Sequence, residues 1–174
     1  MAKGKWAQGI QPRHFQWVIT DRLAICERPG GYGANHRRVR RQEEIIWIRE
    51  NGFAAVVSLI PSEHNLKSYD ELGVPWRHWP FAPSVEVEAA LSQIYPELSN
   101  LLADDKTRII LHSEEVGERL AGLLAGYLRW SGMVPVTFEA ITVIERILER
   151  QMGPSGRNIV GAAERLISAD SADV

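Results

Sequence analysis

The most chemically suggestive stretch of this 174-residue chain is an apolar run that is followed by a polar turn and an arginine. Residues 109–111 predict a short buried strand, and a helix with apolar residues at helical spacing is predicted to begin at Arg119. In the turn between them, at residues 112–118, free backbone N–H groups and the positive end of the helix dipole converge. The sequence therefore predicts an anion-binding loop, which Arg119 could close with a two-pronged contact to phosphate.

This arrangement resembles the phosphate-binding loop of the cysteine-dependent tyrosine and dual-specificity phosphatases, which has His, Cys, five residues and Arg between a strand and a helix. Residues 15–30 and 52–59 are also similar to small atypical dual-specificity phosphatases, and the resemblance covers roughly residues 12–165. It implies a three-layer α/β fold with a central, mainly parallel sheet flanked by helices. The loop would consist of His112, Ser113, Glu114, Glu115, Val116, Gly117, Glu118 and Arg119.

Several positions depart from the pattern that the resemblance implies for an active phosphatase. The catalytic cysteine is a thiolate at neutral pH, whereas the hydroxyl of Ser113 keeps its proton and has no base in the loop. Val116 replaces a glycine, which is costly if the backbone there has a positive φ. Leu120 replaces a hydroxyl residue, and residues 80–84, where the general acid is expected, contain no carboxylate. The sequence therefore predicts a pseudophosphatase with a binding or scaffold role.

Carboxylates inside the loop also oppose phosphate binding. Glu114, Glu115 and Glu118 beside one arginine give the loop a net charge of -2. At ~4–6 Å and an effective dielectric of about 20, each carboxylate–phosphate pair costs on the order of 3–4 kcal/mol before screening. Two alternatives remain for these residues. Ser113 to Glu115 could cap the following helix with acidic first-turn residues, or the acidic edge could bind a cationic partner segment.

Two further functions are compatible with the sequence. One is an active phosphomonoester hydrolase that carries a cysteine-to-serine trapping substitution, although this would explain Ser113 alone. The other is an adaptor that binds a phosphorylated or otherwise anionic partner through a run of arginines. These arginines lie just before the predicted helix start at residue 42, where the helix dipole disfavours cations, and this unfavourable placement suggests that they have a use. The simpler interpretation of this basic run is a solvated face that pairs with Glu43 and Glu44. The run contains Arg37, Arg38, Arg40 and Arg41.

The composition narrows the class of protein. The formal net charge is -2, and basic residues are not interleaved with aromatic ones, which argues against nucleic-acid binding. The single cysteine, Cys26, excludes an internal disulfide and a cysteine-built zinc site, and we expect no metal and no cofactor. No stretch approaches ~20 apolar residues, so we expect a soluble, cytoplasmic protein that does not span a membrane.

Strand and helix patterns alternate along the chain and predict one domain at residues 12–168, between a flexible segment at 1–11 and a frayed one at 169–174. Thr137 is expected to begin a capped helix. Strands are predicted at 17–19, 23–25, 53–59, 74–79 and 109–111, and helices at 42–50, 67–72, 85–103, 119–130, from 137 onward and at 157–168.

Overall fold

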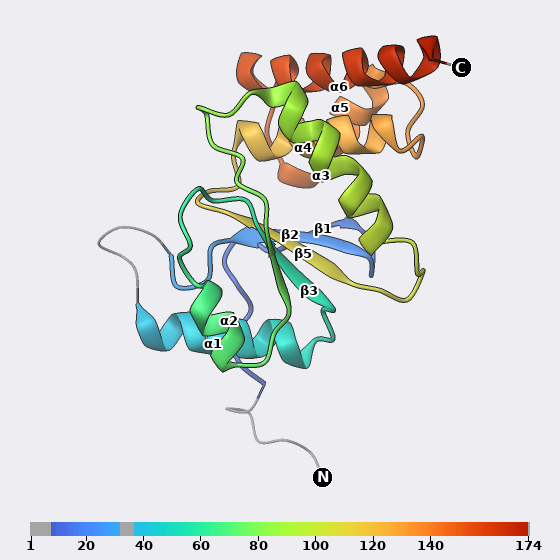
Figure 1. Cartoon of the computed structure of the whole chain (residues 1–174). Coiled ribbons are helices and arrows are strands. Elements are labelled where there is room, and N and C mark those ends of the chain that lie inside the picture. The colour runs from blue at the N-terminus through green and yellow to red at the C-terminus, as the bar shows by residue number, and fades with distance from the viewer. Residues whose placement is uncertain (1–7, 32–36, 174) are drawn as a thin grey trace. The chain divides into compact units, whose positions relative to one another are not determined.

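The computed structural model describes residues 8–31 and 37–173 and divides into two compact units. The sheet unit comprises residues 1–82 and 104–115, and the helical unit comprises residues 83–103 and 116–174 (Figure 1). Most of the N-terminal segment predicted to be flexible, residues 1–7, lies outside the described residues. Its described part contacts a helix, because the backbone N–H of Ile10 donates to the carbonyl of Glu43 at 3.1 Å.

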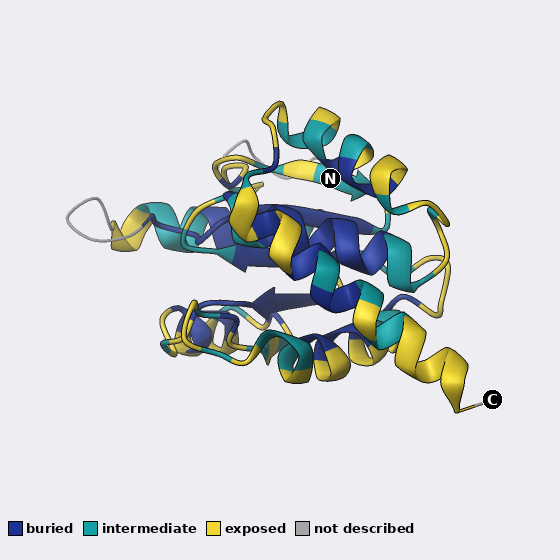
Figure 2. Ribbon diagram, turned by 90° about the horizontal axis from the view of Figure 1, so that it is seen from above, coloured by how far each residue is buried: buried dark blue, intermediate teal, exposed yellow. Residues whose placement is uncertain are grey.

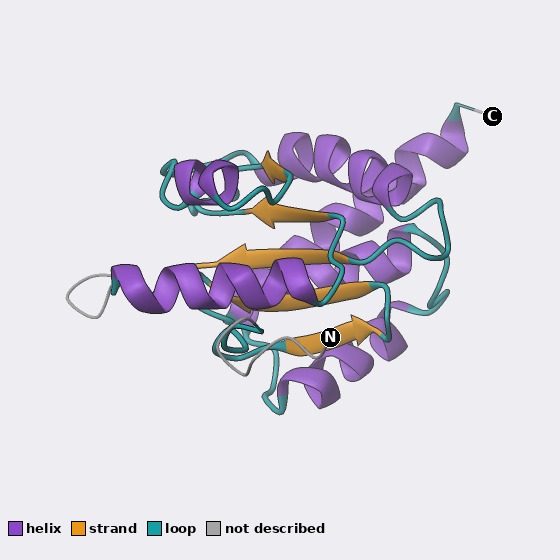
Figure 3. Ribbon diagram, turned by 90° about the horizontal axis from the view of Figure 1, so that it is seen from below, coloured by secondary structure: helices purple, strands orange, loops and turns teal. Residues whose placement is uncertain are grey.

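The sheet unit is built on five strands in the order β1-β2-β5-β3-β4 (Figure 3). The β1–β2 pair is an antiparallel hairpin, whereas β2–β5, β5–β3 and β3–β4 are parallel. The predicted α/β fold with a mainly parallel sheet is therefore confirmed, and the strand that precedes the loop lies at its centre. The strands are β1 (Gln16–Ile19), β2 (Leu23–Glu27), β3 (Ala55–Ser58), β4 (Trp76–His78) and β5 (Ile109–Ser113).

Two helices of the sheet unit, α1 (Arg38–Glu50) and α2 (Leu66–Glu71), pack against one face of these strands. The central strands are almost completely buried because their residues are apolar on both faces (Figure 2). The core on this face joins Ile45, Ile48 and Tyr69 from the helices to Ala24, Cys26, Val56 and Ile110 from the strands. Burial of each large apolar side chain contributes about 1.5–3 kcal/mol.

The helical unit consists of α3 (Val87–Leu101), α4 (Glu118–Trp130), α5 (Thr137–Leu148) and α6 (Pro154–Ala172). Small residues allow α4 to approach α6 closely. A β-carbon added to Gly122 would lie 2.6 Å from the carbonyl oxygen of Gly156, which is closer than real β-carbons come. The hydroxyl of Tyr95 then donates to the carbonyl of Leu123 at 2.9 Å and fastens α3 to α4.

Several helix boundaries differ from those expected, most of all in α1 and α6. Helix α1 begins at Arg38 rather than at residue 42, because arginine favours helix strongly enough to outweigh the dipole penalty. Helix α6 is longer at both ends than the predicted 157–168, with Pro154 in its first turn. Thr137 does not cap α5; Val136 holds that position, and the Thr137 hydroxyl donates to the carboxylate of Glu164. In the part of the chain that is described, no helix is long and apolar enough to cross a membrane.

Candidate functional site

His112 anchors the central strand rather than the loop that follows it. Its ring is fully buried, with Nε2 2.8 Å from the hydroxyl of Ser58 and Nδ1 2.7 Å from the hydroxyl of Tyr69. Burial, and then the positive charges of Arg28 and His78, lower the pKa of His112 to about 3. His112 therefore has a structural role, because its neutral ring connects β5 to β3 and α2.

Ser113 is the last residue of β5, and its hydroxyl is turned back into its own loop. The hydroxyl donates to the carbonyl of Glu115, and the carbonyl of Ser113 accepts the backbone N–H of Arg28 at 2.8 Å. Ser113 does not cap a helix, because the N-cap of α4 is Gly117 and no side chain caps it. The backbone of Val116 is not among the positive-φ positions, so the strain that a β-branched residue would suffer there is absent.

A buried carboxylate lies beside the serine. Glu27 pairs with Ser113 in the parallel register of β2 and β5, so the two side chains extend from the same face of the sheet. Glu27 is buried, and its Oε2 lies 2.9 Å from Nδ1 of His14. A negative charge here disfavours both a thiolate at position 113 and a phosphate next to it. In the sequence, Glu27 stands out only as a glutamate at the end of an otherwise apolar strand. Its position next to Ser113 follows from the register of β2 and β5.

Glu114 is held by an arginine that sequence reasoning missed. Oε1 of Glu114 lies 3.1 Å from Nη1 of Arg28, whose side chain is only 5% exposed. The Nε of Arg28 also donates to the carbonyl of Gly31 at 3.0 Å. The second carboxylate oxygen, Oε2 of Glu114, is buried without a hydrogen-bond partner. Glu114 is therefore tied to Arg28 through one oxygen, although its side chain is 40% exposed.

The second half of the loop, residues 116–119, belongs to the helical unit and begins α4. The Glu118 carboxylate lies against Gly153 at the N-terminus of α6, where the helix dipole favours a negative charge. Nη1 of Arg150 lies 3.5 Å from the carbonyl of Val116. Burial lowers the pKa of Arg119, which remains a guanidinium cation at neutral pH. Of the three loop glutamates, only Glu115 is exposed.

The predicted basic run lies at the N-terminus of α1, and one of its members forms a buried ion pair. Nε of Arg40 lies 2.5 Å from Oε1 of Glu44, whose Oε2 accepts the backbone N–H of Gly30 at 2.8 Å. Glu44 is only 1% exposed, so the expected pairing occurs, but not on a solvated face. This contact fixes the 28–31 segment to the start of α1. Arg37 and Arg38 are exposed.

The loop in which a general acid was expected provides none, and the next carboxylate has a structural role. The backbone N–H of Phe81 donates to the carbonyl of Leu59 at 2.9 Å. Glu86 is the N-cap of α3, where its carboxylate accepts the N–H groups of Glu88 at 3.2 Å and Ala89 at 2.6 Å. Its oxygens therefore stabilise the helix terminus and are not available to protonate a leaving group.

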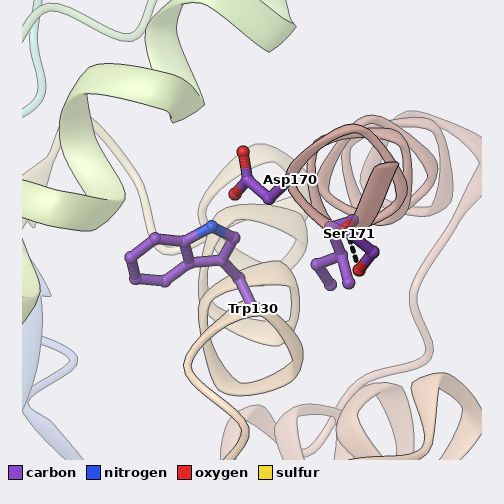
Figure 4. A pocket seen from close by; sticks show the side chains of 4 residues that line it. Trp130, Asp170 and Ser171 are labelled. Atoms are coloured by element: carbon purple, nitrogen blue, oxygen red, sulfur yellow. Dashed lines mark hydrogen bonds between the residues drawn. The ribbon is translucent and has the colours of Figure 1, made fainter. Parts of the chain in front are cut away.

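A separate hollow of about 530 Å³ lies in the helical unit, where Trp130 faces the end of α6 (Figure 4). Its other lining residues are Ile167, Asp170 and Ser171. The Ser171 hydroxyl donates to the carbonyl of Ile167 at 2.9 Å, as serines within helices commonly do. These four residues contain no nucleophile–base pair, so the hollow adds no chemistry to the loop.

Comparisons with known proteins identify the fold. No family model matches the sequence, and a search of curated proteins finds no match. Among solved structures, a kinase-associated phosphatase in which serine replaces the catalytic-site cysteine is 18% identical, with 91% of this chain and 98% of that chain covered and a TM-score of 0.75. Tk-PTP in its active form is 16% identical over 87% of this chain and 96% of its own, with a TM-score of 0.67.

A variant of human DUSP28 is 14% identical over 91% of this chain and 99% of its own, with a TM-score of 0.63. At these identities the likeness concerns the fold. The chain therefore has the fold of the protein tyrosine and dual-specificity phosphatases.

Proposed function

We propose that this chain is a catalytically silent binding or scaffold protein that is built on the phosphatase fold. The proposal depends on one observation: the Ser113 hydroxyl donates to the carbonyl of Glu115 in its own loop. The adjacent imidazole, His112, is occupied by two hydroxyl groups and is too weakly basic to accept a proton from serine at neutral pH. A serine without a base is a poor nucleophile towards phosphorus.

The surroundings of Ser113 support the same proposal. Glu27 pairs with Ser113 in the strand register and Glu114 follows Ser113 in the chain, so both add negative charge near the nucleophile position. Glu86, the first carboxylate after the loop at 80–84, caps a helix. Hydrolysis of a phosphate ester is therefore disfavoured in three ways: the nucleophile is a serine without a base, the nearby charges are negative, and no general acid is available.

Turnover of p-nitrophenyl phosphate and of a phosphotyrosine peptide by the purified chain tests the proposal. We expect no turnover above that of buffer across mildly acidic to neutral pH. Turnover that disappears in Arg119→Ala would contradict it, because that dependence would show a working phosphate-binding loop.

The second candidate is an active phosphatase in which serine has replaced the cysteine. It is favoured by one observation, namely that the kinase-associated phosphatase with a similar fold carries such a substitution. Ser113→Cys separates the two candidates. Turnover in this variant that is lost again with Arg119→Ala supports the second candidate, whereas silence in a folded Ser113→Cys chain supports the first.

The charges around the loop favour an anionic partner over a cationic one. Glu115 is exposed, whereas Glu114 is paired with Arg28, so the loop offers little unpaired negative charge to a cationic segment. The arginines at the start of α1 include two exposed side chains, Arg37 and Arg38, which suit a phosphorylated segment.

A further inference from the structure

Helices α4 and α6 of the helical unit touch closely along glycines, and this close contact ends at a tryptophan. A β-carbon added to Gly122 would lie 2.9 Å from Cβ of Ile159, and one added to Gly126 would lie 2.9 Å from Cβ of Ala163. Four residues further along α4 the contact position is occupied by Trp130. Residues four apart share a helix face, so the large indole meets the next turns of α6 and a hollow opens beside it.

This hollow combines three kinds of side chain. Trp130 contributes its indole from the end of α4, and Ile167, Asp170 and Ser171 line the hollow from the last turns of α6 (Figure 4). The three residues of α6 lie on one face because they are three and four positions apart. The volume of about 530 Å³ is within the range of small-molecule sites, roughly 300–1,000 Å³.

The indole of Trp130 is held in place from behind. Its ring centroid lies 5.6 Å from that of Tyr95 and 6.3 Å from that of Tyr127, and both tyrosines are buried. The hydroxyl of Tyr95 is itself fixed by the carbonyl of Leu123 at 2.9 Å. Trp130 is only half-buried, so a rigid aromatic surface borders the hollow without having to be ordered by a ligand.

The carboxylate of Asp170 brings an uncompensated negative charge to the hollow. It is exposed and has neither an ion pair nor a hydrogen bond within the part of the chain that the structure describes. Neighbouring arginines are paired elsewhere: Nε of Arg129 lies 2.8 Å from the carboxylate of Glu164, and Arg165 pairs with Glu88. A cation that enters the hollow therefore meets a free carboxylate and an aromatic ring together.

We infer that this hollow binds a small organic ammonium cation. The face of an indole attracts a cation through its quadrupole more strongly than any other side-chain ring, and Asp170 adds a charge of the required sign. Ile167 offers an apolar surface to the alkyl groups of such a cation. The inference goes beyond the proposed function and shares no residue with the loop at 112–119, so each can fail without the other.

The test is a nuclear magnetic resonance titration of the full chain with choline. We expect saturable shifts of the Trp130 indole N–H and of the Ser171 backbone N–H. The comparison ligand is the neutral alcohol in which a tert-butyl group replaces the trimethylammonium group, so that shape is kept and charge is lost. We expect it to bind about tenfold more weakly than choline, because the attraction to the ring and to Asp170 disappears.

Two variants separate the charge from the ring. Asp170→Asn should weaken choline binding about threefold, whereas Asp173→Asn, the matched control, makes the same change at an exposed residue that does not line the hollow. Trp130→Phe identifies the indole resonance by its absence and keeps an aromatic ring next to the tyrosines. Its weaker quadrupole should lower the affinity for choline, measured at the Ser171 N–H, about threefold.

Three outcomes would overturn the inference. Equal affinities for choline and its neutral analogue would show an apolar hollow without selectivity for cations. Equal losses in Asp170→Asn and Asp173→Asn would show a general charge effect. Shifts that do not saturate, or that leave the Trp130 indole unmoved, would show that choline does not bind here.

A peptide with a trimethylated lysine, compared with its unmethylated form, distinguishes the two sources of the cation. Tighter binding of the methylated peptide than of choline, with the same dependence on Trp130 and Asp170, supports the site with a protein segment as its ligand. Equal affinities for the methylated peptide and choline support the site with a free cation as its ligand.

Discussion

A cysteine placed at position 113 would have a carboxylate on either side. Glu27 lies beside this position across the parallel ladder, and Glu114 follows it in the chain. Loop N–H groups and the start of a helix favour a thiolate, whereas both carboxylates disfavour it. The balance of these charges, and not only the identity of the nucleophile, determines whether the loop could be reactive.

For Ser113→Cys, we therefore expect a thiol pKa at or above the ordinary value of about 8.5. Adding Glu114→Gln should lower that pKa, because one negative charge is removed. The rate of alkylation by iodoacetamide as a function of pH measures both values. The native chain is the blank, since Cys26 is fully buried and its pKa is raised by burial and by Glu44 and Glu27. A thiol at position 113 that titrates below neutral pH would contradict the prediction.

Among the elements, α1 is positioned by a buried acid that links it to the preceding loop. Glu44 receives Arg40 on one oxygen and the backbone N–H of Gly30 on the other. A carboxylate with both oxygens used in this way orders the loop as well as the helix. Arg40 is thus held in place at the helix start even though the dipole opposes a positive charge there.

Loss of that acid should destabilise the sheet unit. Glu44→Gln leaves Arg40 without its partner beside a buried amide, and we expect a loss of about 2–4 kcal/mol in the free energy of unfolding. Glu43→Gln is the matched control, because its side chain has no ion pair with the described residues, and its change should stay within about 0.5 kcal/mol. Urea titration measures both, and equal losses would contradict the assigned role.

The contact between α4 and α6 depends on glycine at position 126. A β-carbon there would collide with the Tyr95 hydroxyl and lie 2.9 Å from Cβ of Ala163, so Gly126→Ala should cost about 1–3 kcal/mol. Gly161→Ala on α6 is the control. Its β-carbon would have Nη1 of Arg165 as its neighbour at 3.7 Å, so the gain in helix propensity should leave stability equal or higher. Thermal unfolding that ranks the two variants in the opposite order would refute this packing.

At the scale of the whole molecule, a formal net charge of -2 conceals an uneven arrangement. In the sheet unit, Arg28 and Arg40 are paired with Glu114 and Glu44, while Glu27 is buried and pairs with Ser113 in the strand register. Glu118 is directed to the start of α6 in the helical unit. The local ion pairs within each unit therefore describe the electrostatics of this protein better than its net charge does.

Unfolding of the whole chain should respond to pH through His112. Its pKa is about 3 in the folded state and about 6.5 when unfolded, so the unfolded chain binds the extra proton between these values. Stability from this group is complete above about pH 6.5 and falls as the pH decreases, by on the order of 4 kcal/mol near pH 3. His112→Gln should flatten the fall between about pH 6.5 and 5 in urea titrations. An unchanged slope would contradict the burial of a neutral ring.

The sequence predicted the sheet because strands such as 109–111 are apolar on both faces, and no competing helical pattern exists there. The polar contacts of the site were not predictable in the same way. Arg28 and Glu114 are 86 positions apart, and their pairing depends on the neighbouring positions of β2 and β5 in the sheet. Glu27 beside Ser113 likewise required the strand register. The start of α1 at Arg38 is not evident from charge placement, because the helix propensity of arginine outweighs the dipole there.

The burial of Cys26 has a consequence for how the protein would respond to oxidants. Enzymes that depend on an exposed low-pKa thiolate lose activity when peroxide converts it to a sulfenic acid. Here position 113 carries a hydroxyl that peroxide does not attack, and the one sulfhydryl is enclosed between α1 and the sheet with a raised pKa. Peroxide concentrations that silence thiolate enzymes should therefore leave both Ser113 and Cys26 unmodified.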